Sequence, residues 1–113
     1  MITIYHNPRC TKSRQGVAFL NDHGIEFEEH RYLESGLSLS ELESIIKKLN
    51  IKPLALIRKN EAVWKSDYKG KELSDHDILL AMVNHPKLME RPIIINNNKA
   101  VIGRPTENIF KIL

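Results

Sequence analysis

Apolar and polar residues in the first part of the chain follow the pattern of two short strands joined by a helix. Residues 1–5 are rich in strand-forming side chains, and residues 26–31 alternate apolar and charged positions, which is the period of a half-buried strand. Residues 11–22 repeat apolar positions at helical spacing, and Gly24 then tolerates the left-handed backbone of a helix end. A strand, a crossover helix and a strand form a βαβ unit, which predicts two parallel strands.

The middle of the chain has the period of amphipathic helices. Ser38 is followed three positions later by Glu41, a capping box that predicts the start of a helix. Pro86 prevents the last helix of this region from continuing. Three helices are expected, over residues 39–49, 54–59 and 75–84. We therefore predict a helical block over about residues 37–85.

The end of the chain predicts a β-hairpin followed by a helix. Two apolar runs, residues 93–95 and 99–102, flank three asparagines that tolerate the positive φ of a tight turn. Pro105 suits the first position of a helix, and apolar residues follow it at helical spacing. The order β-α-β, helices, β-β-α predicts an α/β protein with a thioredoxin-like fold. We expect one domain over residues 1–113, with residues 37–85 as a helical insertion.

Composition and charge exclude several classes of protein. The chain has 113 residues, one cysteine and a net charge of +3, so we expect a globular domain without an intrachain disulfide. Cations are scattered among acids, with no basic run that interleaves aromatics, so nucleic acid is not an expected partner. No apolar run approaches the roughly 20 residues that span a bilayer, and no signal peptide precedes the first strand. We predict a cytoplasmic protein with no membrane partner.

The only cysteine lies where the predicted chemistry concentrates. Cys10 follows a proline-containing turn and immediately precedes the first helix, so its sulfur is expected beside free N–H groups and the positive end of the helix dipole. Such a position lowers the pKa of a thiol and attracts a small anion. We predict that Cys10 is a nucleophile and that His6 stabilises its thiolate. Asn7 and Ser13 can donate hydrogen bonds to the sulfur or to a substrate.

Two common cysteine motifs are absent around this residue. Position 16 is Gly, so Cys10 does not begin a C-x5-R phosphate loop, and Ser13 stands where a C-x-x-C pair would have its second cysteine. An adduct on Cys10 must therefore be resolved by an outside thiol, which implies glutathione and a glutaredoxin as reductants. The histidines have no metal-ligand spacing, so neither a metal site nor a bound cofactor is expected.

Three segments of the chain resemble the signatures of one family. They are His6-Asn7-Pro8-Arg9-Cys10 with Ser13-Arg14, then Glu90-Arg91-Pro92-Ile93, and then Gly103-Arg104-Pro105. In this order and spacing they resemble the glutaredoxin-coupled arsenate reductases of the ArsC family, in a reductase-like branch, and the resemblance covers the whole chain. It implies a thioredoxin-like fold in which a cis proline, here Pro92, faces the active-site cysteine.

The resemblance also implies a set of roles. Arg58, Arg91 and Arg104 would bind arsenate, because a guanidinium donates two parallel hydrogen bonds to an oxyanion. The Cys10 thiolate would attack the arsenate, and glutathione as co-substrate would reduce the arsenic. A glutaredoxin would then remove the glutathione from Cys10, with arsenite as the product.

Two other functions remain open from the sequence. Spx-like regulators share the fold and bind RNA polymerase, but they typically carry a cysteine pair. This chain has Ser13 in place of the second cysteine. The motifs around Arg91 and Arg104 favour the oxyanion enzyme over such a regulator. A monothiol glutathione-dependent oxidoreductase would use Cys10 on another substrate.

Overall fold

The structure, a computed structural model that describes all 113 residues, separates the chain into a sheet unit and a helical unit. The sheet unit comprises Met1–Ser35 and Arg91–Leu113, and the helical unit comprises Gly36–Glu90. The sheet unit contains β1 (Ile2–Tyr5), α1 (Thr11–Asp22), β2 (Phe27–His30), α2 (Tyr32–Ser35), β3 (Ile93–Asn96), β4 (Lys99–Ile102) and the 3-10 helix η3 (Thr106–Ile112). The helical unit contains α3 (Leu39–Leu49), η1 (Pro53–Leu56), α4 (Ala62–Asp67), α5 (Asp75–Asn84) and η2 (Pro86–Leu88).

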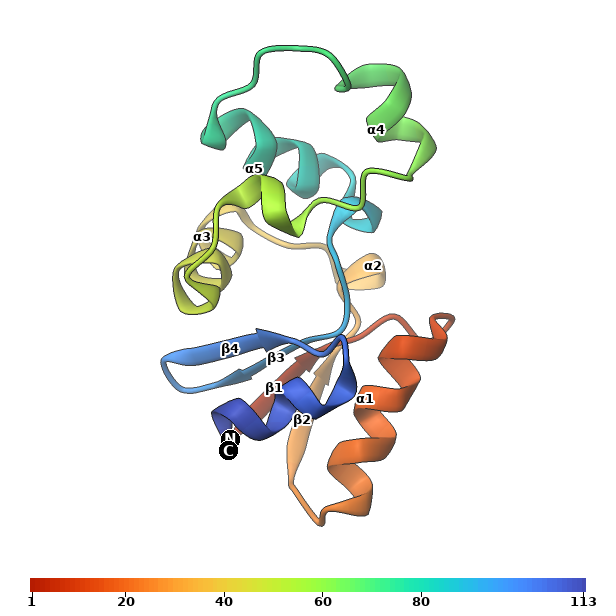
Figure 1. The fold of residues 1–113 in the computed structure, drawn as a ribbon, viewed down its shortest axis with the longest axis vertical. Coiled ribbons are helices and arrows are strands. Elements are labelled where there is room, and N and C mark those ends of the chain that lie inside the picture. Colours follow the sequence, from red (N-terminus) through yellow and green to blue (C-terminus); the bar gives the residue numbers. More distant parts are fainter. The chain divides into compact units, whose positions relative to one another are not determined.

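The sheet has the strand order β2-β1-β3-β4, as Figure 1 shows. The strands β1 and β2 are parallel, whereas β3 is antiparallel to both β1 and β4. The strand–helix–strand unit and the C-terminal hairpin therefore form as predicted, and Asn97 has the positive φ of 56° that the turn requires. This is the predicted α/β class with a thioredoxin-like order of elements.

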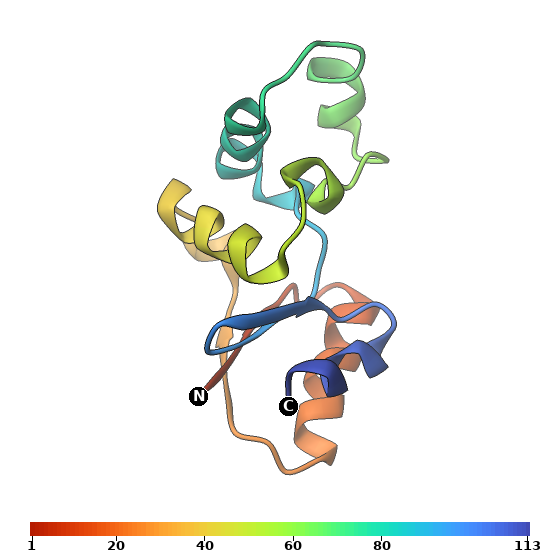
Figure 2. The same cartoon turned by 60° about the vertical axis from the view of Figure 1, so that its left-hand side comes forward.

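The core of the sheet unit lies on the face that α1 and η3 cover, which Figure 2 shows in a second view. Side chains two positions apart on a strand share a face, so Ile2 and Ile4 both point into this core. The buried cluster consists of Ile2, Ile4, Leu20, Ile94, Ile109 and Ile112. Each such side chain contributes about 1.5–3 kcal/mol when buried, so this layer fixes α1 against the sheet.

Pro92 fits closely between two glycines at the start of β3. The Arg91–Pro92 peptide bond is cis, which confirms the expectation from the resemblance, and the Arg104–Pro105 bond is cis as well. A Cβ on Gly16 would lie 3.1 Å from Pro92 Cγ, and a Cβ on Gly103 would lie 2.9 Å from the same atom. The absence of side chains at both positions therefore lets Pro92 approach α1 and the end of β4.

Two predicted helices take a different form because contacts distant in sequence override local preference. The segment predicted as a helix over residues 54–59 is only the short turn η1, since Ile57 forms a β-bridge with Met89 and has an extended backbone. After Pro105 the chain forms the 3-10 helix η3 rather than an α-helix, and Pro105 precedes its first residue. The Asn108 side chain there donates hydrogen bonds to the carbonyls of residues 102 and 104.

The helical unit is stabilised by local caps and a small apolar core. Ser38 and Glu41 form the predicted capping box at the start of α3, and Ser74 with Asp77 forms a second one at the start of α5. The α3 helix ends at Asn50, which has a left-handed backbone with φ of 55°. The most deeply buried side chains of the unit are Leu42, Ile45, Leu56, Met82, Leu88 and Met89.

Candidate active site

Cys10 occupies the N-cap position of α1, with an extended backbone at φ −95° and ψ 124°. Its N–H donates to the carbonyl of Asn7 at 3.0 Å, and its carbonyl accepts from the N–H of Arg14 at 2.9 Å. The backbone N–H groups of Ser13 and Lys12 face the Cys10 sulfur and lower the pKa of the thiol. The start of the helix therefore directs its free donors at the thiol, because these N–H groups have no partner inside the helix.

The net effect of these surroundings is a Cys10 thiol pKa below its ordinary value. Burial acts in the opposite direction and raises the pKa, but the hydrogen bond from the Ser13 N–H and the charge and hydrogen bond of Arg91 outweigh it. The Lys12 N–H adds to the same effect. The sulfur is therefore more readily ionised than a free thiol, and the thiolate is the nucleophilic form.

Arg104 and Arg91 converge on this sulfur from the C-terminal half of the sheet unit. Arg104 Nη2 lies 3.5 Å from Cys10 Sγ, and Arg104 Nε donates to the carbonyl oxygen of Arg91 at 2.7 Å. Arg91 lies close enough to lower the pKa of the Cys10 thiol by its charge, yet its Nε and Nη1 atoms are buried and have no hydrogen-bond partner. Buried cationic donors without an acceptor are costly to stability. An anion bound at this place would supply the acceptors that the two buried nitrogens lack.

Three of the predicted site residues bond to one another within the Cys10 loop, and their side chains have no hydrogen bond to the sulfur. They are His6, Asn7 and Ser13. Ser13 is fully buried; its Oγ lies 2.6 Å from His6 Nδ1 and accepts a hydrogen bond from the Asn7 N–H at 3.0 Å. Asn7 Oδ1 accepts from the N–H of Arg9 at 3.0 Å. These side chains hold the loop that carries Cys10, and Ser13 also contributes the N–H described above.

The pKa of His6 is lowered from its ordinary value. Burial is the largest cause, since His6 is only 4% exposed; Glu29 raises the pKa, whereas Arg31 and Arg14 lower it further. His6 therefore favours the neutral imidazole near neutral pH. In that form it shares a hydrogen bond with the Ser13 hydroxyl, 2.6 Å from Nδ1.

Arg58, the third arginine predicted to bind substrate, has quite different surroundings within the helical unit. It follows Ile57 at the bridge to Met89, and its N–H donates to the carbonyl of Leu88 at 2.7 Å. Its Nη1 donates to Glu61 Oε1 at 3.3 Å, and its Nε lies 3.9 Å from Glu90 Oε1. Two carboxylates thus partly neutralise this guanidinium.

Sequence reasoning assigned no role to the end of β2, which the structure brings to the Cys10 loop. Because β1 and β2 are parallel, both strands end at the same edge of the sheet. Glu29 Oε1 lies 4.0 Å from His6 Nε2, and Arg31 Nε lies 3.5 Å from Glu29 Oε2. The predicted parallel pairing was the signal that these residues would meet. Arg14 also stabilises the loop, with Nη1 donating to the Pro8 carbonyl at 2.9 Å.

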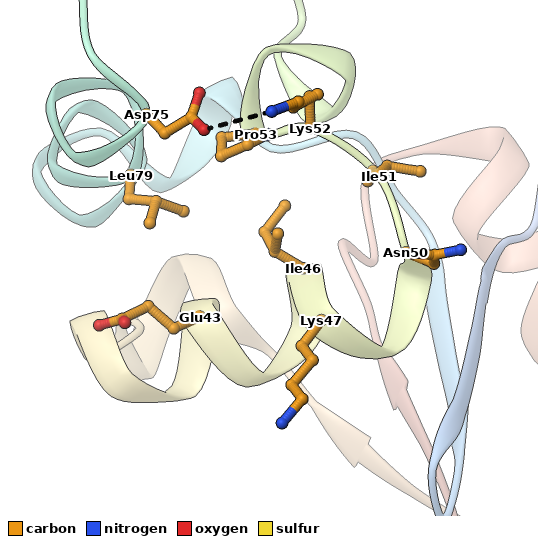
Figure 3. Close-up of a pocket in the computed structure, with 9 residues that line it drawn as sticks. All are labelled: Glu43, Ile46, Lys47, Asn50, Ile51, Lys52, Pro53, Asp75 and Leu79. Carbon is orange, nitrogen blue, oxygen red and sulfur yellow. Dashed lines mark ion pairs between the residues drawn. The ribbon is translucent and has the colours of Figure 1, made fainter.

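A separate hollow of about 500 Å³ lies in the helical unit, between α3 and the start of α5. Figure 3 shows Ile46 and Leu79 pointing toward each other across it, with the ion pair of Lys52 and Asp75 at its rim. Its lining contains none of the predicted site residues.

No group of three or more metal-ligating side chains is present in the structure. None of its helices combines the length and apolar character needed to cross a bilayer.

Comparisons with known proteins agree with this arrangement. The ArsC family profile matches residues 5–112. An arsenate reductase of Haemophilus influenzae is 41% identical over 114 residues, covering 99% of this chain and 98% of that protein. The uncharacterized protein YfgD of Escherichia coli K12 is 40% identical, covering 99% of this chain and 96% of that protein. The structure of an arsenate reductase from Vibrio cholerae matches with a TM-score of 0.95 and 40% identity, covering 99% of this chain and 97% of that one.

Proposed function

The chain belongs to the ArsC family, and on that premise we propose that it reduces arsenate with glutathione and a glutaredoxin as the source of electrons. Relatives about 40% identical over their full length carry the name arsenate reductase, which supports the reaction. The observation that carries the proposal is the pair of buried, unpaired donors of Arg91 beside the Cys10 sulfur. A tetrahedral oxyanion would supply the acceptors that these donors lack.

In the first step the Cys10 thiolate attacks the arsenic of bound dihydrogen arsenate. A sulfur–arsenic bond forms and one arsenate oxygen leaves as water after protonation, which gives a covalent thioarsenate. Arg91 and Arg104 hold the remaining oxygens and balance their negative charge. Arg58 is assigned as the third binding arginine on the family resemblance, with the smallest contribution of the three, because Glu61 and Glu90 already balance its charge.

In the second step glutathione attacks the arsenic of the adduct. The two sulfurs bound to arsenic then join as a mixed disulfide between Cys10 and glutathione. Both sulfur–arsenic bonds break, and one of their electron pairs stays on arsenic, which leaves as arsenite. One arsenate and two thiols are thereby converted to one arsenite, one water and one disulfide. Because Cys10 is the only cysteine of the chain, a glutaredoxin removes the glutathione and restores the thiol.

The remaining assignments follow from the same arrangement. His6 acts as a neutral imidazole that orients Ser13, and Asn7 and Ser13 shape the loop that receives the substrate. The reaction needs no metal and no resident cofactor, since the electrons come from thiols. It belongs in the reducing cytoplasm, where glutathione keeps thiols reduced.

The test is arsenate-dependent oxidation of NADPH by the purified protein in the presence of glutathione, a glutaredoxin and glutathione reductase. We expect turnover in the wild-type protein and none in Cys10→Ser, because the serine hydroxyl cannot form a disulfide with glutathione. Circular dichroism of both proteins controls for folding. Turnover that persists in Cys10→Ser would overturn the proposal. A folded wild-type protein with a reactive thiol but no arsenate reduction would favour another substrate for the thiol or a regulatory partner such as RNA polymerase.

A further inference from the structure

A cavity of about 440 Å³ lies beside the Cys10 loop, entirely within the sheet unit. It is lined by His6, Asn7, Pro8, Arg9, Arg31, Leu33 and Glu34. This volume falls in the range of small-molecule sites. His6 and Asn7 belong to the Cys10 loop, but none of the three arginines assigned to arsenate lines the cavity.

The parallel pairing of β1 and β2 creates this cavity. Both strands end at one edge, so residues 6–9 after β1 line the cavity together with Arg31, Leu33 and Glu34 after β2. A smaller hollow of about 390 Å³ shares Arg31 and Glu34 with it. The two hollows therefore adjoin at these residues, which form one polar surface beside the cysteine loop.

The charges on the walls are arranged for a ligand with charges of both signs. Arg9 and Glu34 are exposed, and neither side chain has an ion-pair partner in the structure. Arg31 is half-exposed and reaches Glu29 with its Nε at 3.5 Å. The cavity thus offers two guanidinium groups and one carboxylate, and Leu33 adds an apolar surface.

We propose that this cavity is the binding site of the reducing thiol, a short peptide thiol with two carboxylates and one ammonium group. Glutathione has this set of charges, and the inference rests on the proposed function for its role as co-substrate. Arg9 and Arg31 bind the carboxylates, because a guanidinium pairs with a carboxylate through parallel hydrogen bonds. Glu34 binds the ammonium group.

The position of the cavity fits delivery of a thiol to the adduct on Cys10. Arg9 directly precedes Cys10, and consecutive Cα atoms are about 3.8 Å apart. An extended tripeptide spans about 10 Å, which exceeds the one-residue step along the chain from Arg9 to Cys10, so a tripeptide bound at Arg9 can reach the Cys10 loop. The arginines assigned to arsenate and those assigned to glutathione are then different residues, which allows both ligands to be bound together.

The first test is direct binding, without turnover. S-methylglutathione, which has no free thiol, is titrated into the full chain and followed by calorimetry and by amide chemical shifts. We expect binding that weakens about tenfold in Arg9→Ala and again in Arg31→Ala, with shifts at residues 6–9 and 31–34. Lys99→Ala is the matched control, because it removes one exposed positive charge from β4. Its affinity should equal that of the wild type.

The second test separates the two substrates kinetically. In Arg9→Ala we expect the KM for glutathione to rise about tenfold, while the KM for arsenate changes less than about twofold. Glutathione-dependent turnover with an unchanged glutathione KM in Arg9→Ala and in Glu34→Gln would overturn the cavity assignment and leave the proposed function standing. Binding of S-methylglutathione in the cavity by a protein that does not reduce arsenate would overturn the proposed function instead. If Lys99→Ala weakens glutathione binding as much as Arg9→Ala does, the effect comes from the net charge of the protein and not from the cavity. That result would also overturn the assignment.

Discussion

The Cys10 end of the sheet unit and the Ile57–Met89 bridge of the helical unit each hold an arginine predicted from sequence, but they treat it in opposite ways. Arg91 has two buried nitrogens with no acceptor. Arg58 has Glu61 at 3.3 Å and Glu90 at 3.9 Å. One guanidinium is left unsatisfied beside a thiol, whereas the other is already compensated by carboxylates.

This difference shows how to distinguish an anion site from a structural ion pair. An unsatisfied buried donor lowers stability unless a ligand supplies the acceptor, so its retention indicates a function in binding. A compensated arginine contributes to its own unit whether or not a ligand binds. The two residues should therefore respond differently to the same substitution, with activity the main loss at one and stability the main loss at the other.

The largest effect is expected for Arg91→Met. The catalytic efficiency toward arsenate should fall about 100- to 1000-fold, which is typical when one donor to a developing negative charge is removed. The melting temperature should stay the same or rise, because the variant removes buried donors that have no partner. Steady-state kinetics and thermal unfolding measure the two quantities. A drop in melting temperature large enough to explain the lost activity would contradict the comparison.

An effect of intermediate size is expected on the Cys10 thiol. Its lowered pKa means that the thiolate persists below the pH at which a free thiol, with a pKa of about 8.5, becomes protonated. The rate of alkylation by iodoacetamide, followed against pH, should therefore have its midpoint below that value in the wild type. In Arg91→Met the midpoint should move upward and alkylation at neutral pH should slow, while Lys99→Met should keep the wild-type profile. A midpoint at the ordinary thiol value in the wild type would argue against an activated cysteine.

The smallest effect is expected for Arg58→Met, and it should be mainly a loss of stability. Removing the guanidinium leaves Glu61 and Glu90 without their cation, which should lower the free energy of unfolding by about 0.5–1 kcal/mol. Urea unfolding measures the change. Adding Glu61→Gln to Arg58→Met should restore part of the loss, because one unpaired carboxylate is removed. A variant as stable as the wild type would show that these ion pairs do not stabilise the unit.

Much of the fold could be predicted because its signals are local. The capping box of Ser38 and Glu41 and the turn at Asn97 depend on side chains only a few positions apart. The helix start at Cys10 is equally local, so the position of the cysteine at the start of α1 followed from the sequence. The helix predicted over residues 54–59 failed because the bridge of Ile57 to Met89 joins positions far apart in the chain. The local helix preference of residues 54–59 gives no information about that bridge.

The sequence by itself determined the order of elements, the cysteine at the start of α1 and, through the resemblance, the arginines on which the chemistry is proposed to depend. Only the tertiary structure decided which donors remain unsatisfied. It leaves two buried nitrogens of Arg91 without acceptors, gives Arg58 two carboxylates and brings Arg31 to the wall of a cavity beside Arg9. The physical reason is that hydrogen-bond satisfaction depends on which groups meet in space. The pairing of the strands decides which groups lie close together, because parallel β1 and β2 bring the end of β2 beside the loop after β1.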